Sequence, residues 1–142
     1  MAFVPTGFPP LDQPHRELDR CLRELAQAVR TRDVVDARGW TCLLSEILGE
    51  HFAEEEALMR ARGWSLVARH AESHALLHLQ VQRFERRLAV GDLTPELARW
   101  ALQGIPELLR FHAIASDFGF GKFALGHAPD PGQAGLPHPR RR

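Results

Sequence analysis

The chain has 142 residues, of which 44% are hydrophobic and 25% charged, and its formal net charge is +0. This length suits one domain with its own core, and the balanced charge argues against a protein that binds nucleic acid or an acidic membrane surface. No apolar run is long enough to span a membrane and no signal-peptide pattern opens the chain, so we expect a cytoplasmic protein without a membrane segment. Cys21 and Cys42 form no CxxC pattern, and both are interpreted as small core residues.

The first helix is predicted between a proline-rich N-terminal arm and a short turn. From there on, apolar residues recur at spacings of three and four, which is the helical period. The helix is expected to begin at Asp12 or Gln13, to hold Pro14 in its first turn, where a missing N–H is no loss, and to end near Arg30. Residues 1–11 are interpreted as the arm.

The second and third helices follow with short connections. The second is expected to begin near Asp36 and to end at Gly63, a residue suited to a C-terminal cap. Ser65 is expected to cap the third helix, which continues with a regular apolar stripe as far as Gly91.

The fourth helix is predicted to open at Thr94-Pro95, because threonine is a good cap and proline fits the first helical position. Gly104 and Pro106 interrupt its pattern and predict a kink. Four helices of similar length with short loops indicate an all-α, antiparallel up-down-up-down bundle. The bundle is placed at residues 12–125, followed by a flexible tail at residues 126–142.

Ionisable residues occupy positions on the apolar stripes where leucine would be usual; they are His15, His51, Glu55, His70, His74 and His112. Burying unpaired charges costs several kcal/mol each, whereas a bound cation would satisfy them together. The pairs on the second and third helices are four residues apart, so each pair shares a helix face. Asp117 lies five residues after His112, about 140° around an α-helix, and must reach back toward the core. The pattern predicts a metal site to which all four helices contribute.

Four segments carry a resemblance to a known family: Leu11–His15, His51–Met59, His70–His74 and His112–Phe118. They resemble the corresponding segments of the hemerythrins, and more narrowly of the single-domain bacterial hemerythrins. The resemblance implies two iron ions joined by a bridging oxo or hydroxo group. One iron would be held by His70, His74 and His112 and the other by His15 and His51, with Glu55 and Asp117 bridging them.

The resemblance also implies that dioxygen binds reversibly at the iron of His15 and His51. The walls of the oxygen pocket would be Phe52, Met59, Leu108, Leu109 and Ala113. The family commonly has tryptophan and isoleucine where this chain has Leu108 and Ala113, so we expect weaker shielding and faster oxidation to the diferric form. His78 is interpreted as a non-ligand. Glu54, Glu56 and Glu72 flank ligands in sequence and could serve as acceptors that orient the imidazoles, but a solvated face is the favoured interpretation.

The leading hypothesis is a non-enzymatic oxygen carrier, storage or delivery protein, with dioxygen as ligand and an oxygen-consuming enzyme as recipient. Two alternatives stay open: an oxygen or redox sensor acting through a protein partner, and a di-iron oxidase or peroxidase. Oxygen-activating bundles are richer in carboxylates, whereas this chain offers five histidines to two carboxylates, which favours carriage. The sequence leaves open the oligomeric state, the oxygen affinity, the metal loaded, and whether nitric oxide or peroxide is the true ligand.

Overall fold

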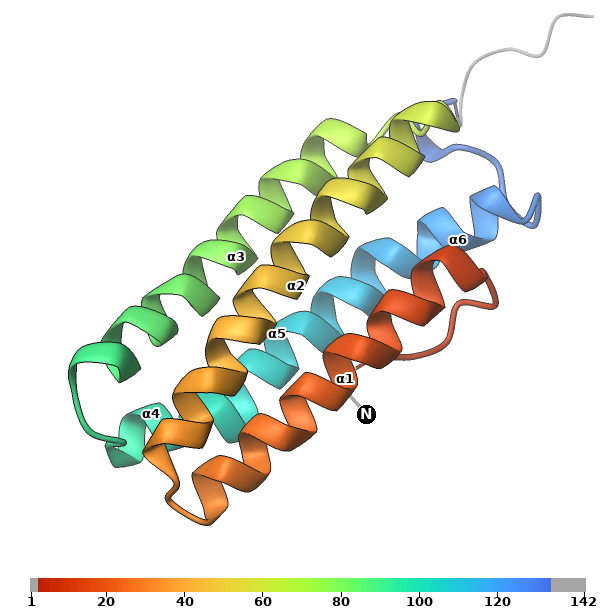
Figure 1. The fold of residues 1–142 in the computed structure, drawn as a ribbon. Coiled ribbons are helices and arrows are strands. Elements are labelled where there is room, and N and C mark those ends of the chain that lie inside the picture. The colour runs from red at the N-terminus through yellow and green to blue at the C-terminus, as the bar shows by residue number, and fades with distance from the viewer. Residues whose placement is uncertain (1–2, 134–142) are drawn as a thin grey trace, which may run out of the picture.

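The computed structural model describes residues 3–133, which form four antiparallel helical rods (Figure 1). The first three rods are α1 (Pro9–Arg30), α2 (Val34–Ala61) and α3 (Val67–Val90). The fourth rod joins α4 (Pro95–Arg99), η1 (Trp100–Gly104), α5 (Ile105–His112), η2 (Ala113–Asp117) and α6 (Phe118–Ala124). Neighbouring rods pack as α1 on α2, α2 on α3, α3 on α5 and η1 on α1, which closes the bundle. The predicted all-α, up-down-up-down bundle is confirmed, and no strand occurs within residues 3–133.

Two of the helices begin earlier than the sequence predicted. Pro9 and Pro10 occupy the first two positions of α1, where proline costs no hydrogen bond, so Pro14 lies inside the helix and not in its first turn. In α2 the Asp33 side chain caps the helix by accepting the Asp36 N–H at 3.0 Å. Two prolines suited to the first turn thus extend α1 upstream, and a capping aspartate extends α2.

The N-terminal arm packs against the bundle. Asp12 holds it, because its carboxylate accepts the N–H and hydroxyl of Thr6 at 2.8 and 2.7 Å and the N–H of Gly7 at 2.9 Å. Phe3 is buried, and its ring stacks on the His15 imidazole with centroids 4.4 Å apart. The described part of the predicted arm therefore belongs to the folded domain, and residues 1 and 2 lie outside the described chain.

The chain after α6 returns to the loop between α2 and α3 (Figure 1). Gly63 follows the end of α2 with a φ of 69°, as expected for a residue that caps a helix C-terminus. Ser65 does not cap α3, which begins at Val67. Instead the Ser65 hydroxyl donates to the buried Asp130 carboxylate, and the Ser65 N–H donates to the same carboxylate at 3.2 Å. The folded chain thus continues past the predicted boundary at residue 126, and residues 134–142 of the predicted tail lie outside the described residues.

The fourth rod contains two π turns, one of them where the sequence predicted a kink. The Ile105 N–H donates to the Trp100 carbonyl five residues earlier, which defines η1 just before Pro106. Proline has no N–H to donate and its ring crowds the carbonyl four residues earlier, so a widened turn before it relieves that crowding. Glycine is suited to position 104 because any other residue would place a Cβ 2.4 Å from the Trp100 ring, which is too close for packing.

Burial separates the two cysteines, and it places Ala115, expected on the inward stripe of the fourth helix, at the surface. Cys21 is buried in the core as predicted, whereas Cys42 is exposed, so the interpretation of Cys42 as a core residue is wrong. It follows the buried Thr41 and precedes the exposed Leu43, on the outer side of α2. Among the helices of residues 3–133, none combines the length and the apolar character that crossing a bilayer requires.

Candidate metal centre

A polar layer crosses the bundle between two apolar clusters. The larger cluster lies on one side of this layer, and each rod contributes to it; examples are Leu18, Leu48, Leu77 and Leu109. The smaller cluster, which contains Leu11, Met59 and Phe120, lies on the other side. All seven predicted ligands meet in the layer, each at most 5% exposed: His15, His51, Glu55, His70, His74, His112 and Asp117. The four rods bring residues 102 positions apart in the sequence, from 15 to 117, to one depth.

Glu55 presents its two oxygens to different groups of histidines. Its Oε2 lies 3.1 Å from Nε2 of His51. Its Oε1 lies 2.5 Å from Nε2 of His70 and 3.2 Å from Nε2 of His74. The carboxylate therefore spans two sets of imidazoles.

Asp117 divides its oxygens in the same way. Its Oδ2 lies 3.2 Å from Nε2 of His15, and its Oδ1 lies 3.0 Å from His70 and 3.1 Å from His112. Together the two carboxylates define a side with three imidazoles, His70, His74 and His112, and a side with two, His15 and His51. The division between sides that the family resemblance implied is the one that these distances show.

The second π turn places Asp117 in the layer. In an α-helix, residues five apart point about 140° apart, but a π turn pairs residues five apart through its hydrogen bonds, so such residues stand one above the other. In η2 the Phe118 N–H donates to the Ala113 carbonyl five residues back. His112 and Asp117 thereby share the inner face, and the aspartate has no need to reach around the helix.

Deletion of the exposed Ala115 should therefore be tolerated. It would leave His112 and Asp117 four residues apart, which is the same-face spacing of an ordinary α-helix. We expect the variant to keep its helical circular dichroism and its metal content. Deletion of the exposed Leu76 in α3 is the matched control, since α3 has no π turn to absorb it and the following core residues would rotate by about 100°. Equal loss of folding in both variants would contradict this account of η2.

Several buried polar atoms in the layer have no hydrogen-bond partner among the described residues. They are both ring nitrogens of His15, Oε2 of Glu55, Nε2 of His112 and Oδ1 of Asp117. Four of these five are the atoms that face other ligands at 3.1 to 3.2 Å, yet none satisfies hydrogen-bond geometry. Unpartnered buried polar atoms cost free energy, and cations bound on the two sides of the layer would satisfy all four.

The donor atoms form two groups in which all atoms lie within 4.8 Å of one another. One group is Glu55, His70, His74, His112 and Asp117, and the other is His15, His51 and Glu55. Imidazole nitrogen and carboxylate oxygen are ligands that suit iron, zinc and manganese. The residues present therefore fit a two-metal centre with nitrogen and oxygen ligands.

Electrostatics keeps the carboxylates ionised. Burial and the nearby Asp117 charge oppose ionisation of Glu55, but the imidazoles of His51, His70 and His74 that face its oxygens outweigh them and lower its pKa to about 2. Burial likewise opposes ionisation of Asp117, whose histidine partners hold its pKa well below the usual value. Burial lowers and the two carboxylates raise the pKa of His70, with a net rise to about 9. The layer is an anionic site that holds a proton on His70 when no metal is bound.

Three ligand histidines are also held through their outer nitrogen. Nδ1 of His70 and of His112 hydrogen-bond to the hydroxyls of Ser116 and Ser73, the latter at 2.9 Å. Nδ1 of His74 lies 3.0 Å from Oε2 of Glu56. The prediction that Glu56 belongs to a solvated face is therefore wrong, whereas Glu54 and Glu72 are exposed as predicted. Neither serine carried a sequence signal.

The predicted pocket walls lie at different places around the layer. Phe52 stacks on His74 with centroids 3.8 Å apart. Met59 belongs to the smaller apolar cluster, Leu109 and Ala113 are buried in the larger one, and Leu108 packs against the larger one while partly exposed. His78, predicted to be a non-ligand, hydrogen-bonds through Nε2 to the Ser45 carbonyl at 3.0 Å and is in neither donor group.

Fold and site together define a metal-binding domain: a four-helix bundle with a buried layer of imidazoles and carboxylates. The family model of the hemerythrin HHE cation binding domain matches residues 6–122. The chain therefore belongs to the hemerythrin family. No curated protein matches it.

Proposed function

We propose that the protein binds dioxygen reversibly at a pair of iron ions and serves as a non-enzymatic carrier or store of oxygen. One observation carries the proposal: two carboxylates are shared between three imidazoles on one side and two on the other. A metal ion on the three-imidazole side would have one more protein ligand than a metal ion on the two-imidazole side. The side of His15 and His51 would keep a position for an external ligand, and a reduced iron pair supplies the electrons that hold dioxygen there.

The residues around the layer support binding without turnover. The layer lies between two apolar clusters, and such surroundings limit the access of water to a metal site. On the two-imidazole side, the Phe3 ring lies over His15. The donor set is rich in imidazole, in contrast to the Glu-x-x-His repeats of oxygen-activating bundles.

An anaerobic optical titration of the iron-reconstituted protein tests the proposal. We expect a visible absorption band that appears on addition of oxygen and disappears when oxygen is removed, over repeated cycles. Irreversible bleaching with turnover of an added substrate would favour an oxidase or peroxidase. No band with iron bound would reject oxygen binding, and an oxidation-dependent protein complex without reversible uptake would favour a sensor.

Larger side chains at Leu108, four residues before His112, and at Ala113, directly after it, should slow oxidation of the oxygenated protein. In a Leu108→Trp, Ala113→Ile double variant, more apolar volume would exclude water from the neighbourhood of the layer. The rate is measured as the decay of the oxygenated spectrum in air-saturated buffer. The matched control is Ile114→Leu, because Ile114 is exposed on the outer side of the same rod. A double variant that oxidises as fast as this control would contradict the prediction.

A further inference from the structure

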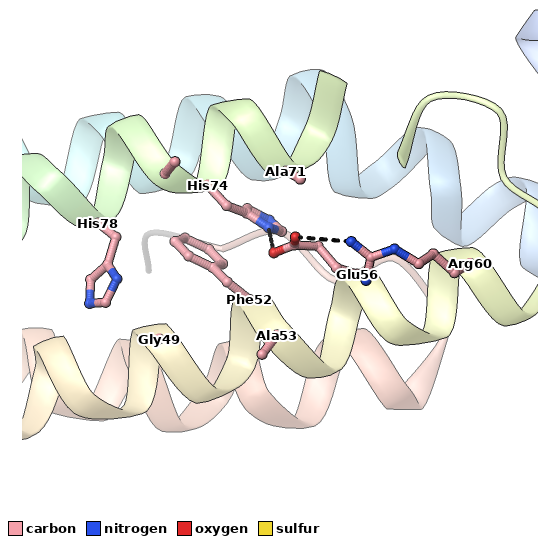
Figure 2. A pocket seen from close by; sticks show the side chains of 9 residues that line it. Gly49, Phe52, Ala53, Glu56, Arg60, Ala71, His74 and His78 are labelled. Carbon is pink, nitrogen blue, oxygen red and sulfur yellow. Dashed lines mark hydrogen bonds and ion pairs between the residues drawn. The ribbon is translucent and has the colours of Figure 1, made fainter. Parts of the chain in front are cut away.

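Two parallel rows of side chains run along α2, each with a spacing of four residues. His51 and Glu55 face the metal-binding layer. The next row, Phe52, Glu56 and Arg60, faces a cleft of about 350 Å³ between α2 and α3 (Figure 2). The two rows meet at His74, which lines the cleft and belongs to the ligand set.

The His74 imidazole is fixed on three sides. Its Nε2 faces Glu55 at 3.2 Å, its Nδ1 lies 3.0 Å from Oε2 of Glu56, and its face stacks on Phe52 at an interplanar angle of 9°. Figure 2 shows Glu56 between His74 and Arg60, with dashed contacts to both. Because a carboxylate only accepts, the Nδ1 of His74 carries the proton, and Nε2 is left for the metal.

The acceptor at His74 differs in kind from those at the other two histidines on the same side. His70 and His112 meet serine hydroxyls, which are neutral, whereas His74 meets a carboxylate. Hydrogen bonds to a charged acceptor are about twice as strong as neutral ones, and a carboxylate acceptor raises the basicity of the ligating nitrogen. Arg60 lies 3.6 Å from Glu56 and is 61% exposed. Solvent therefore weakens the ion pair between Arg60 and Glu56, and the Glu56 charge remains available to His74.

We propose that Glu56 is a positioning residue that orients His74 and makes it the strongest nitrogen donor of the three-imidazole side. This inference rests on the proposed two-metal centre. Since Glu56 lines an open cleft, its truncation adds space at a solvent-accessible place and leaves the apolar clusters intact. The variants are therefore expected to fold.

Zinc(II), a diamagnetic probe, tests the proposal by competition with a chromophoric chelator. We expect Glu56→Ala to weaken the affinity of the three-imidazole site about 10- to 100-fold, the range found when such outer partners are removed. Glu56→Gln keeps an acceptor oxygen without the charge and should lose less. Ser73→Ala, which removes the neutral partner of His112, should also lose less than Glu56→Ala. Glu54→Gln is the matched control on the exposed neighbour and should bind zinc as the unaltered protein does.

Imidazole ¹⁵N spectra of the metal-free protein give an independent readout. Nδ1 of His74 should be protonated in the unaltered protein, in Glu54→Gln and in Glu56→Gln, and should lose this proton signal in Glu56→Ala. Circular dichroism confirms that each variant is folded. Zinc affinity in Glu56→Ala equal to that in Glu54→Gln, or a His74 Nδ1 that carries no proton, would overturn the proposal.

These results are separable from the test of oxygen binding. If iron-loaded protein takes up no oxygen but Glu56→Ala weakens zinc binding, the role of Glu56 stands and the oxygen proposal falls. If the unaltered protein binds no zinc, the positioning role falls together with the two-metal centre, whatever the state of the His74 proton.

Discussion

Replacement of Glu55 by glutamine should reduce the iron bound after reconstitution from a pair of ions per chain to a single ion or none. Among residues 3–133, Glu55 alone belongs to both donor groups, and its two oxygens face His51 on one side and His70 and His74 on the other. An amide has one acceptor oxygen and no charge, so it cannot bridge as a carboxylate does. Iron content is measured by elemental analysis after gel filtration.

The same substitution should destabilise the metal-free protein. The ionised Glu55 is buried against histidines, and removing one partner of a buried charged pair costs about 3 kcal/mol. Urea unfolding measures this loss as a lower midpoint. Glu54→Gln, on the exposed face of the same helix, should change neither the iron content nor the midpoint. A Glu55→Gln protein that retains a full pair of ions would refute the bridging role.

Metal should stabilise the fold strongly, and by an amount that grows with pH. A ligand that binds only the folded state, present at 1,000 times its Kd, adds about 4 kcal/mol to the free energy of unfolding.

The metal-free layer has its own pH dependence. The pKa of His70 is raised from 6.5 to about 9, so the contribution of His70 to stability is complete below pH 6.5 and is lost as pH rises to about 9. The pKa of Glu55 is lowered from 4.5 to about 2, so its contribution is lost as pH falls through that range.

The proton on His70 must leave before its Nε2 can bind a metal, and competition from protons weakens as pH rises. Between pH 6.5 and 9 the metal-free protein should therefore become less stable while the metal gains affinity. We expect the difference in Tm between zinc-loaded and metal-free protein to widen across this interval. Differential scanning calorimetry at several pH values checks it, and a difference that narrows toward pH 9 would contradict the assignment.

The rods and their inward histidines were predictable because they follow from local periodicity. A spacing of four identifies one face of a regular α-helix, which is enough to place His70 and His74 together. Asp117 was expected to reach back toward the core from five residues after His112, and its bridging role was implied by the family resemblance, but its approach to the layer depends on a π turn. Periodicity assumes 3.6 residues per turn, and no residue of Ala113–Asp117 marks a local change.

Other features depend on contacts between segments far apart in the sequence. Ser65 looked like a helix cap, but its partner is Asp130, 65 residues later. Glu54 and Glu56 flank the same ligand, and only the position of α3 decides that Glu56 reaches a histidine while Glu54 faces solvent. Helical periodicity alone does not supply such pairings.

The contact of Phe3 with His15 bears on how the protein is prepared for experiment. A purification tag fused ahead of Met1 would be attached two residues from an aromatic ring that covers a candidate ligand. The bulk of the tag would compete with Phe3 for its place over His15, and histidines in the tag would compete for metal. The measured metal contents and oxidation rates would then be those of the fusion protein. Proteins for the measurements above are best made without a tag on the segment that leads to Phe3.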